Sequence, residues 1–301
     1  LNMNIARLNL CLLFTFSLLS LQVYSQNRKD YFKTQIALGE LTDPQLKEVS
    51  GITPAYQEGN FWVHNDSGDG ATIYLIDRQA KLLKKFSLEG VSVVDCEDID
   101  RVKIGDTYFL VLADIGNNAG KRTWTCLYVF PEPQADDPGL ISKKSIRAIF
   151  LKFPGQQRLD AESIMIDPID NMLYVISKRE FRSTVYSAAV FTNVKQQYFT
   201  LNRIAELPFT FATASAIDQT GTQLLVKNIT HIFYWQRNRS ESWKQVLQRK
   251  PAILPYQVEP QGEAIAFDSN GTGFYTISER PFGLKSYLYF FERNQYIYDK
   301  H

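Results

Sequence analysis

The chain of 301 residues has a formal net charge of +1 and contains three cysteines. No block of lysine and arginine gives it the electrostatic footprint of a nucleic-acid-binding protein, and three cysteines are too few for a disulfide scaffold, so Cys96 and Cys126 are expected to be packed thiols. The sequence also lacks a Walker-type glycine loop, a dinucleotide-binding fingerprint, a Gly-x-Ser-x-Gly elbow and a Cys/His metal cluster. Function must therefore be sought in local clusters of other side chains.

Residues 1–25 have the pattern of a secretory signal peptide. Arg7 precedes an apolar run over residues 8–23, and residues 23–25 have the spacing of a cleavage site. The run is shorter than the roughly 20 apolar residues that a membrane span needs, and it contains polar residues. We therefore expect one mature domain over residues 26–301 that is secreted or periplasmic, monomeric and free of the membrane.

Five copies of one pattern follow a strand-like stretch at residues 32–41. Each copy opens with an acidic or hydroxyl residue two positions before an isoleucine, and continues with two further apolar or aromatic strands. The copies are EVSGI with NFWVHNDSGDG and TIYLID; DCEDI with TYFLVLADIGNN and CLYVF; DAESI with MLYVISKRE and TVYSAAV; TASAI with QLLVKN and HIFYW; and GEAIAF with GFYTISER and YLYFF. A fourth strand is expected at residues 81–88, 145–153, 198–205 and 243–248.

The spacing of the copies predicts an all-β fold, a β-propeller. The opening residues lie 47, 65, 53 and 48 residues apart, which are the lengths of propeller blades with four short strands. Five blades are expected, with residues 32–41 supplying the outer strand of the last blade so that the ring closes. Six blades stay possible because the 65-residue interval could hold a degenerate blade, although Pro131, Pro133 and Pro138 favour a loop there.

The opening residues of the five copies are candidate metal ligands: Ser50, Glu97, Glu162, Ser215 and Glu263. The first strand of each blade lines the channel of a propeller, and the side chain two positions earlier points the same way. Those earlier residues are Glu48, Asp95, Asp160, Thr213 and Gln261. Clustered carboxylates repel unless a cation lies among them, and a set of oxygen donors alone favours Ca²⁺. The alternative is that these carboxylates only accept hydrogen bonds from nearby backbone amides.

The order Ser, Glu, Glu, Ser, Glu over five blades resembles the calcium-activated apyrases, which are secreted five-bladed propellers that hydrolyse nucleoside di- and triphosphates around a central Ca²⁺. The segments EVSGI, AESIMIDPIDNMLYVISKRE and QGEAIAFD are similar to that family. The resemblance implies that the five opening residues bind the ion. The segment HNDSGDG departs from the family, because it lacks the family's Arg in this turn. The segments HNDSG, DxEDI, ADIGNN and QGEAIAF also resemble secreted bacterial propellers described as phytase-like or esterase-like.

Polar residues end the second strand of each copy, at the channel mouth where the first strands begin. Four of them are candidate phosphate clamps: Lys178, Arg179, Lys227 and Arg280. Asp66 or Asp114 could orient an attacking water. Both acids stand in Asp/Gly/Asn-rich stretches, so a purely structural role in a turn is the alternative.

The sequence thus supports three hypotheses. The first is a secreted Ca²⁺-dependent phosphohydrolase, apyrase-like, that acts on a small phosphate compound. The second is a non-enzymatic propeller that binds a ligand or protein and holds a structural Ca²⁺. The third is a phytase-like or esterase-like hydrolase. An open coordination position above the ion would separate the first from the second.

Overall fold

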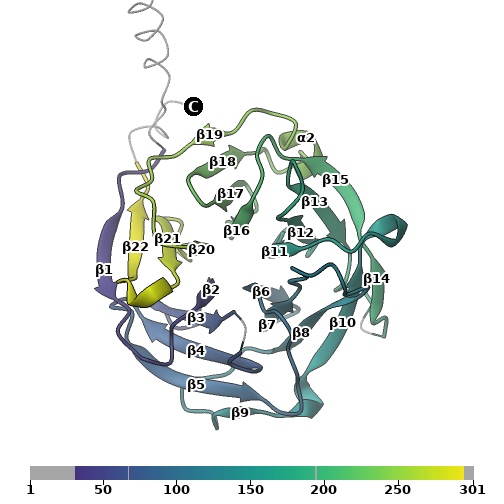
Figure 1. Cartoon of the computed structure of the whole chain (residues 1–301). Coiled ribbons are helices and arrows are strands. Elements are labelled where there is room, and N and C mark those ends of the chain that lie inside the picture. The colour runs from purple at the N-terminus through teal and green to yellow at the C-terminus, as the bar shows by residue number, and fades with distance from the viewer. Residues whose placement is uncertain (1–30, 67, 194, 295–301) are drawn as a thin grey trace, which may run out of the picture.

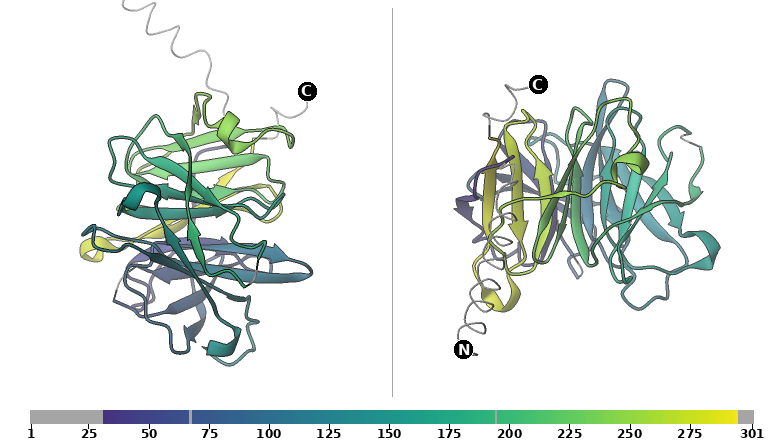
Figure 2. Two further views of the ribbon diagram at one scale, coloured as in Figure 1. Left: turned by 90° about the vertical axis from the view of Figure 1, so that its right-hand side faces the viewer. Right: turned by 90° about the horizontal axis from the view of Figure 1, so that it is seen from above.

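The computed structural model describes residues 31–66, 68–193 and 195–294, and Figure 1 shows them as a ring of small sheets around a central channel. Each of the five sheets is one blade, so the predicted all-β, five-bladed propeller is confirmed. The two views in Figure 2 show the same ring from its sides. The predicted signal peptide and its cleavage site lie outside the described residues. No helix within them is long and apolar enough to cross a bilayer.

Each blade runs from an inner strand at the channel to an outer strand at the rim. The first two blades each have five strands: β2 (Val49–Pro54), β3 (Asn60–Asn65), β4 (Thr72–Asp77), β5 (Leu82–Leu88) and β9 (Leu140–Ile141); then β6 (Asp98–Ile104), β7 (Thr107–Asp114), β8 (Thr125–Pro131), β10 (Arg147–Lys152) and β14 (Tyr198–Thr200). The other three have four: β11 (Ala161–Ile166), β12 (Leu173–Ser177), β13 (Thr184–Ala188) and β15 (Asn202–Glu206); β16 (Ala212–Ile217), β17 (Gln223–Asn228), β18 (Ile232–Gln236) and β19 (Ala252–Ile253); β20 (Gly262–Phe267), β21 (Gly273–Ser278), β22 (Tyr287–Glu292) and β1 (Ile36–Glu40). The described residues also form three short 3₁₀ turns, at Lys143–Ser145, Pro154–Gln156 and Pro281–Gly283, and one short α-helix.

The hydrophobic core lies between neighbouring blades. Inner strands are buried on both faces, as in β11, whereas strands nearer the rim, such as β5, alternate between buried and more exposed positions. Between the first two blades, Trp62 and Phe86 pack with Ile99 and Phe130. The free thiols of Cys96 and Cys126 are buried, which confirms the prediction of packed thiols. Since each blade shares a core with both neighbours, the inner strands and the residues at their ends are fixed relative to one another.

The N-terminal strand closes the ring, as predicted. β1 pairs antiparallel with β22, with Ile36 opposite Phe290 and Glu40 opposite Tyr287. In Figure 1 the two strands lie side by side although they come from opposite ends of the described chain. Phe32 adds a bridge to Arg293 beyond the strand pair. The last blade therefore has a protected outer edge.

The long interval between the second and third copies holds no sixth sheet in the described residues. After β8 the chain returns to the first blade, where β9 pairs parallel with β5. In the same way β14 pairs parallel with β10 of the second blade before β15 joins the third. The strand predicted at residues 198–205 is therefore two strands in two blades. The extra residues therefore tie the second blade to the first and the third blade to the second.

The prediction of a strand at residues 243–248 is wrong, because residues 243–246 form the short helix α2 (Trp243–Val246). The Ser242 side chain accepts a hydrogen bond from the Gln245 backbone N–H, and the Gln245 side chain accepts one from the Ser242 backbone. This capping box satisfies amides at the start of a helix. The outer strand of the fourth blade is β19 instead, which pairs with β18.

Candidate metal centre at the upper mouth of the channel

The inner strands begin at one end of the channel, here called the upper mouth, and a bulge marks the start of four of them. In β2 the register shifts between Val49 and Gly51, so Ser50 has no partner in the ladder. The same shift places Glu162 in β11, Thr213 in β16 and Glu263 in β20. A bulge takes one residue out of the strand pairing and re-aims its side chain. In the second blade Glu97 directly precedes β6, and its N–H donates to the carbonyl of Ala113.

These five residues form what is called here the donor ring: Ser50, Glu97, Glu162, Thr213 and Glu263. Neighbouring members are connected across the blades. Ser50 Oγ donates to the Glu97 carbonyl at 2.9 Å, and Thr213 Oγ1 donates to the carbonyl of Gly262, next to Glu263, at 3.2 Å. Four of the five predicted ligands therefore occupy equivalent positions at the same mouth.

Ser215 does not occupy the equivalent position in the fourth blade, and Thr213 does. Ser215 lies opposite Val226 on the next strand, just as Ile164 lies opposite Val175, so the sequence pattern was displaced by two residues in this blade. The sequence pattern counts two residues back from an isoleucine, and in this blade it uses Ile217. In the structure Ser215 occupies the position that this isoleucine has in the other blades. The Ser215 hydroxyl lies 2.9 Å from Ser163 Oγ and 3.4 Å from the Ile164 carbonyl, deeper in the channel.

Carboxylates cluster at the donor ring. One oxygen each from Asp66, Asp95 and Glu97 lies within 4.8 Å of the others, and the same holds for Glu97, Asp160 and Glu162. Glu97 belongs to both groups, so the two groups are continuous. Asp95 and Asp160 stand two residues before donor-ring members, where alternation along the strand predicts them. Each group is compact enough for a single metal ion to bind one oxygen from every member.

The electrostatics of this cluster favour protons or another cation. Burial, followed by the charges of neighbouring carboxylates, raises the pKa of Asp66 to about 7 and that of Glu279 to about 8. Burial likewise raises the pKa of Glu162 to about 7 and that of Glu97 well above its ordinary value. Like charges brought together in a partly dry site disfavour ionisation of all of them. A bound cation would relieve this repulsion.

Lys178 places one cation among these carboxylates. Its Nζ lies 2.6 Å from Glu162 Oε2 and 3.7 Å from Glu263 Oε1, and only 14% of the side chain is exposed. Burial opposes its charge, but the carboxylates of Glu162 and Glu263 outweigh burial and raise its pKa. Lys178 was predicted as a phosphate clamp on the rim, whereas the structure gives it two acidic partners inside the ring.

The other three predicted clamps also have partners within the protein. Arg179 Nε lies 2.6 Å from Asp160 Oδ2, and one terminal nitrogen donates to Asn118, but half of the side chain remains exposed. Lys227 is fully buried, its Nζ donates to the Gly262 carbonyl at 2.5 Å, and burial lowers its pKa to about 8. Arg280 donates from Nη1 to the Asp43 carbonyl at 3.0 Å. Arg179 is therefore the most accessible of the four cations.

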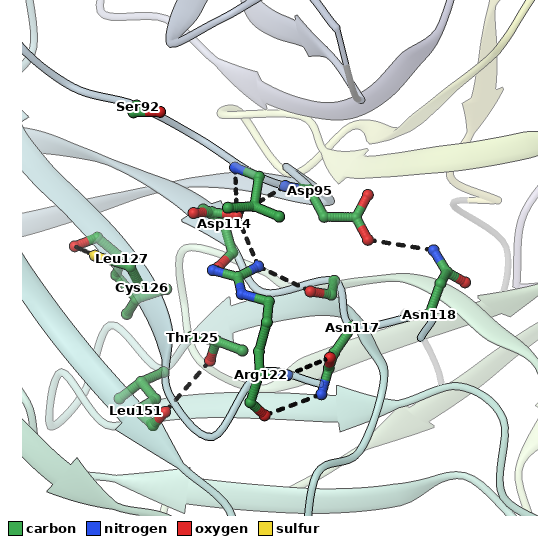
Figure 3. Close-up of polar contacts among 12 residues, drawn as sticks. Ser92, Asp95, Asp114, Asn117, Asn118, Arg122, Thr125, Cys126, Leu127 and Leu151 are labelled. Carbon is green, nitrogen blue, oxygen red and sulfur yellow. Dashed lines mark hydrogen bonds and ion pairs between the residues drawn. The ribbon is translucent and has the colours of Figure 1, made fainter. Parts of the chain in front are cut away.

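The two candidate general bases differ sharply. Asp114 Oδ1 accepts hydrogen bonds from the backbone amides of Val94 and Asp95 and lies 2.8 Å from Arg122 Nη1, as Figure 3 shows. Asp114 is thus a structural residue that positions the loop carrying Asp95. Oδ1 of Asp66, by contrast, is buried and has no hydrogen-bond partner within the described ranges.

Sequence reasoning gave no role to Arg122, which holds this loop together. Arg122 donates to the carbonyls of Gly116 and Asp114 and pairs with the Asp114 carboxylate (Figure 3). Gly116 lies against the site, because a Cβ added there would stand 2.2 Å from Glu97 Oε1 and 2.4 Å from Asp95 Oδ2. The glycine in ADIGNN was the available signal, since a close backbone approach is a common reason for glycine.

Comparison with known proteins does not assign the chain to a family. No protein-family model matches the chain, and no curated protein matches it. Among solved structures it is similar to a chain of a nidogen/laminin complex (TM-score 0.48, 13% identity, 79% of this chain and 74% of that chain) and to a luciferin-regenerating enzyme (0.46, 12%, 83% and 93%). A further similar structure is the hydrazine synthase of Kuenenia stuttgartiensis (0.44, 12%, 84% and 97%). Function has to be argued from the site itself.

Proposed function

We propose that the upper mouth binds Ca²⁺ and that the protein is a Ca²⁺-dependent hydrolase of phosphate esters or anhydrides. The observation that carries this proposal is the excess of carboxylates over cations. Glu97, Asp95 and Asp66 lie within reach of one ion, and no lysine or arginine in the described residues forms an ion pair with any of them. Closely spaced, partly buried carboxylates without a counter-charge are the usual environment of a bound cation.

The donor chemistry supports calcium among the common divalent ions. The donor ring, together with Asp66, Asp95 and Asp160, offers carboxylate and hydroxyl oxygens. Ca²⁺ takes about six to eight oxygen ligands at roughly 2.3–2.6 Å in flexible geometry, whereas Zn²⁺ favours nitrogen and sulfur. Mg²⁺ demands a stricter octahedron than this irregular set of loop and bulge residues provides.

The residues around the site have distinct parts in the proposed reaction. A bound Ca²⁺ would supply Lewis-acid charge to the oxygens of a phosphoryl group. Asp66, whose Oδ1 has no hydrogen-bond partner in the described residues, would accept the proton of the attacking water. Arg179 would hold a phosphate oxygen, because its exposed guanidinium keeps Nη1 without a partner in the described part of the chain. Asp114 and Arg122 would keep the Asp95 loop in place.

The test combines metal binding with turnover. Calorimetry with CaCl₂ on the chelator-treated protein should show a single site that Glu97→Gln abolishes and that Glu206→Gln, a control on the exposed face of β15, leaves intact. Hydrolysis of ATP, ADP, phytate, p-nitrophenyl phosphate and p-nitrophenyl acetate is then measured with calcium and with EDTA. Calcium-dependent release of inorganic phosphate supports the proposal, and the absence of calcium binding overturns it.

A non-enzymatic propeller with a structural ion is the second candidate, and Lys178 favours it. An internal ammonium bonded to Glu162 and Glu263 already connects two blades at the mouth, as a purely structural centre would do. Calcium binding that raises the melting temperature, without turnover of any compound in the panel, would assign the site this role. Turnover of the acetate ester alone would instead indicate esterase-like chemistry.

A further inference from the structure

The channel holds a second feature at its opposite end, the lower mouth, where the inner strands end. A cavity of about 280 Å³ lies there, lined by residues of all five blades. One isoleucine from each blade lines it, and these five residues are called here the isoleucine wall: Ile52, Ile99, Ile166, Ile217 and Ile265. The exposed residues Lys103, Pro168 and Gln219 also line it, so the cavity is open to solvent.

The acidic groups in this cavity are already satisfied by the protein. Asp100 accepts from the backbone amides of Arg101 at 2.7 Å and Ile166 at 2.8 Å, one on each oxygen. Asp218 Oδ1 accepts from the amides of Thr222 and Gln223, and its Oδ2 accepts from the Gln223 side chain. Carboxylates whose two oxygens both already accept hydrogen bonds from the protein offer less to a cationic ligand. The lower mouth therefore differs in character from the donor ring.

Arg101, in contrast, presents free donors in a fixed orientation. Its Nε donates to Glu132 Oε2 at 2.7 Å, and its Cζ lies 3.6 Å from the centre of the Tyr108 ring. The other oxygen of Glu132 accepts from Trp62 Nε1 and from the Tyr56 amide, so Glu132 is itself held firmly. Within residues 31–66, 68–193 and 195–294, nothing accepts a hydrogen bond from Nη1 or Nη2 of Arg101. A guanidinium fixed at Nε and stacked on a ring is preorganised for a planar anion.

Lys103 adds a second cation beside Arg101. Its side chain is exposed, and its Nζ lies 5.6 Å from the centre of the same Tyr108 ring. No described carboxylate pairs with it. Arg101 and Lys103 thus form a cationic edge next to the isoleucine wall.

We propose that the lower mouth binds a small carboxylic acid with an apolar body, its carboxylate on Arg101 and Lys103 and its body against the isoleucine wall. The planar carboxylate matches the two free terminal nitrogens of the guanidinium. The cavity volume is near the lower limit of the roughly 300–1,000 Å³ typical of ligand pockets, so the body is a short alkyl chain or a single ring. The site is independent of metal binding at the upper mouth.

Ligand-observed NMR and calorimetry on the full chain test this proposal with hexanoate, octanoate and phenylacetate. Phenylacetamide and hexanamide keep the apolar body without the charge, and inorganic phosphate keeps charge without the body. The acids should bind at least about tenfold more tightly than the amides and than phosphate, since a hydrogen-bonded charge in such a site contributes that much or more. Equal binding of acids and amides, or no binding of any acid at millimolar concentration, overturns the proposal.

Three variants locate the binding. Arg101→Lys keeps the charge but loses the planar fork, Lys103→Gln removes the second cation, and Ala216→Phe fills the cavity from β16. Each should weaken phenylacetate binding by about threefold or more, and Ala216→Phe should abolish it. Lys81→Gln, on an exposed turn of the first blade, is the matched control. Should Arg101→Lys fail to fold, the other two variants decide, and unchanged affinity in both would refute the site.

Discussion

Replacing Lys178 by methionine distinguishes the effect of the lysine ammonium on the donor ring from the effect of a bound metal ion. Methionine keeps most of the length of the side chain and removes its charge, so the carboxylates of Glu162 and Glu263 lose the ammonium that lies 2.6 and 3.7 Å away. Removing one partner of a buried ion pair costs about 3–5 kcal/mol, because the other charge stays buried without compensation. In a domain of this size that corresponds to a fall in melting temperature of roughly 6–20 °C when no divalent ion is present.

Calcium should reverse much of this loss. A ligand at about 100 times its dissociation constant stabilises the folded state by about 2.7 kcal/mol. Without Lys178, neither the ammonium charge nor its bonds to Glu162 and Glu263 compete with the ion. The Lys178→Met protein should therefore bind calcium more tightly than the wild type and gain more stability from it.

The assay is thermal unfolding followed by circular dichroism, in EDTA and over a calcium titration, with Lys81→Met as the exposed control. The wild type and the control should give one curve of melting temperature against calcium concentration, and Lys178→Met a lower but steeper one. Parallel curves for wild type and Lys178→Met would show that no cation binds beside Glu162 and Glu263, and the reasoning about the donor ring would then be refuted.

Three further predictions address the ring and the channel. Thr213→Val should weaken calcium binding by roughly tenfold in calorimetry while Ser215→Ala leaves it unchanged, and the reverse result would restore the register expected from the isoleucine pattern. Gly116→Ala should also weaken calcium binding, because its methyl group would stand 2.2 Å from Glu97 Oε1; unchanged affinity with an unchanged melting temperature would contradict that geometry. Burial raises the pKa of Asp100 from 3.8 to about 7, so the folded state holds this proton more tightly, and up to about 4 kcal/mol of stability present below pH 4 is lost as pH rises to 7. Asp100→Asn should flatten stability over this range in urea unfolding at several pH values, and parallel profiles would show that Asp100 is not responsible.

Sequence periodicity was enough to predict the fold because each blade repeats the same local constraints. The inner strand of every blade must begin near the axis, and this requirement keeps one polar residue at the start of each copy. It picked out Ser50, Glu97, Glu162 and Glu263, which lie at equivalent positions at the starts of their inner strands. It failed at Ser215 because β16 has a serine where the other blades have the landmark isoleucine. An alignment of blades that depends on one residue type gives the wrong register in a blade that has a different side chain at that position.

The electrostatic partners could not be predicted, because they depend on contacts between blades. A lysine after a strand is consistent with an exposed clamp, and only the spatial arrangement shows that Lys178 turns inward to Glu162. Asp114 is similar, since its partner Arg122 lies eight residues further on in an irregular loop. The capping box at Ser242 was readable from the sequence, and recognising it would have prevented the prediction of a strand there.

The pairing of β1 with β22 sets the order in which this protein can complete its structure. The four inner strands of each of the first two blades and all strands of the third and fourth blades come from one continuous stretch of chain, but the fifth blade needs two segments about 250 residues apart, as the register of Ile36 with Phe290 shows. During synthesis β1 must therefore wait until β22 has been made. Until then the nascent ring exposes a free strand edge, and a competing strand that captured β22 would leave it open.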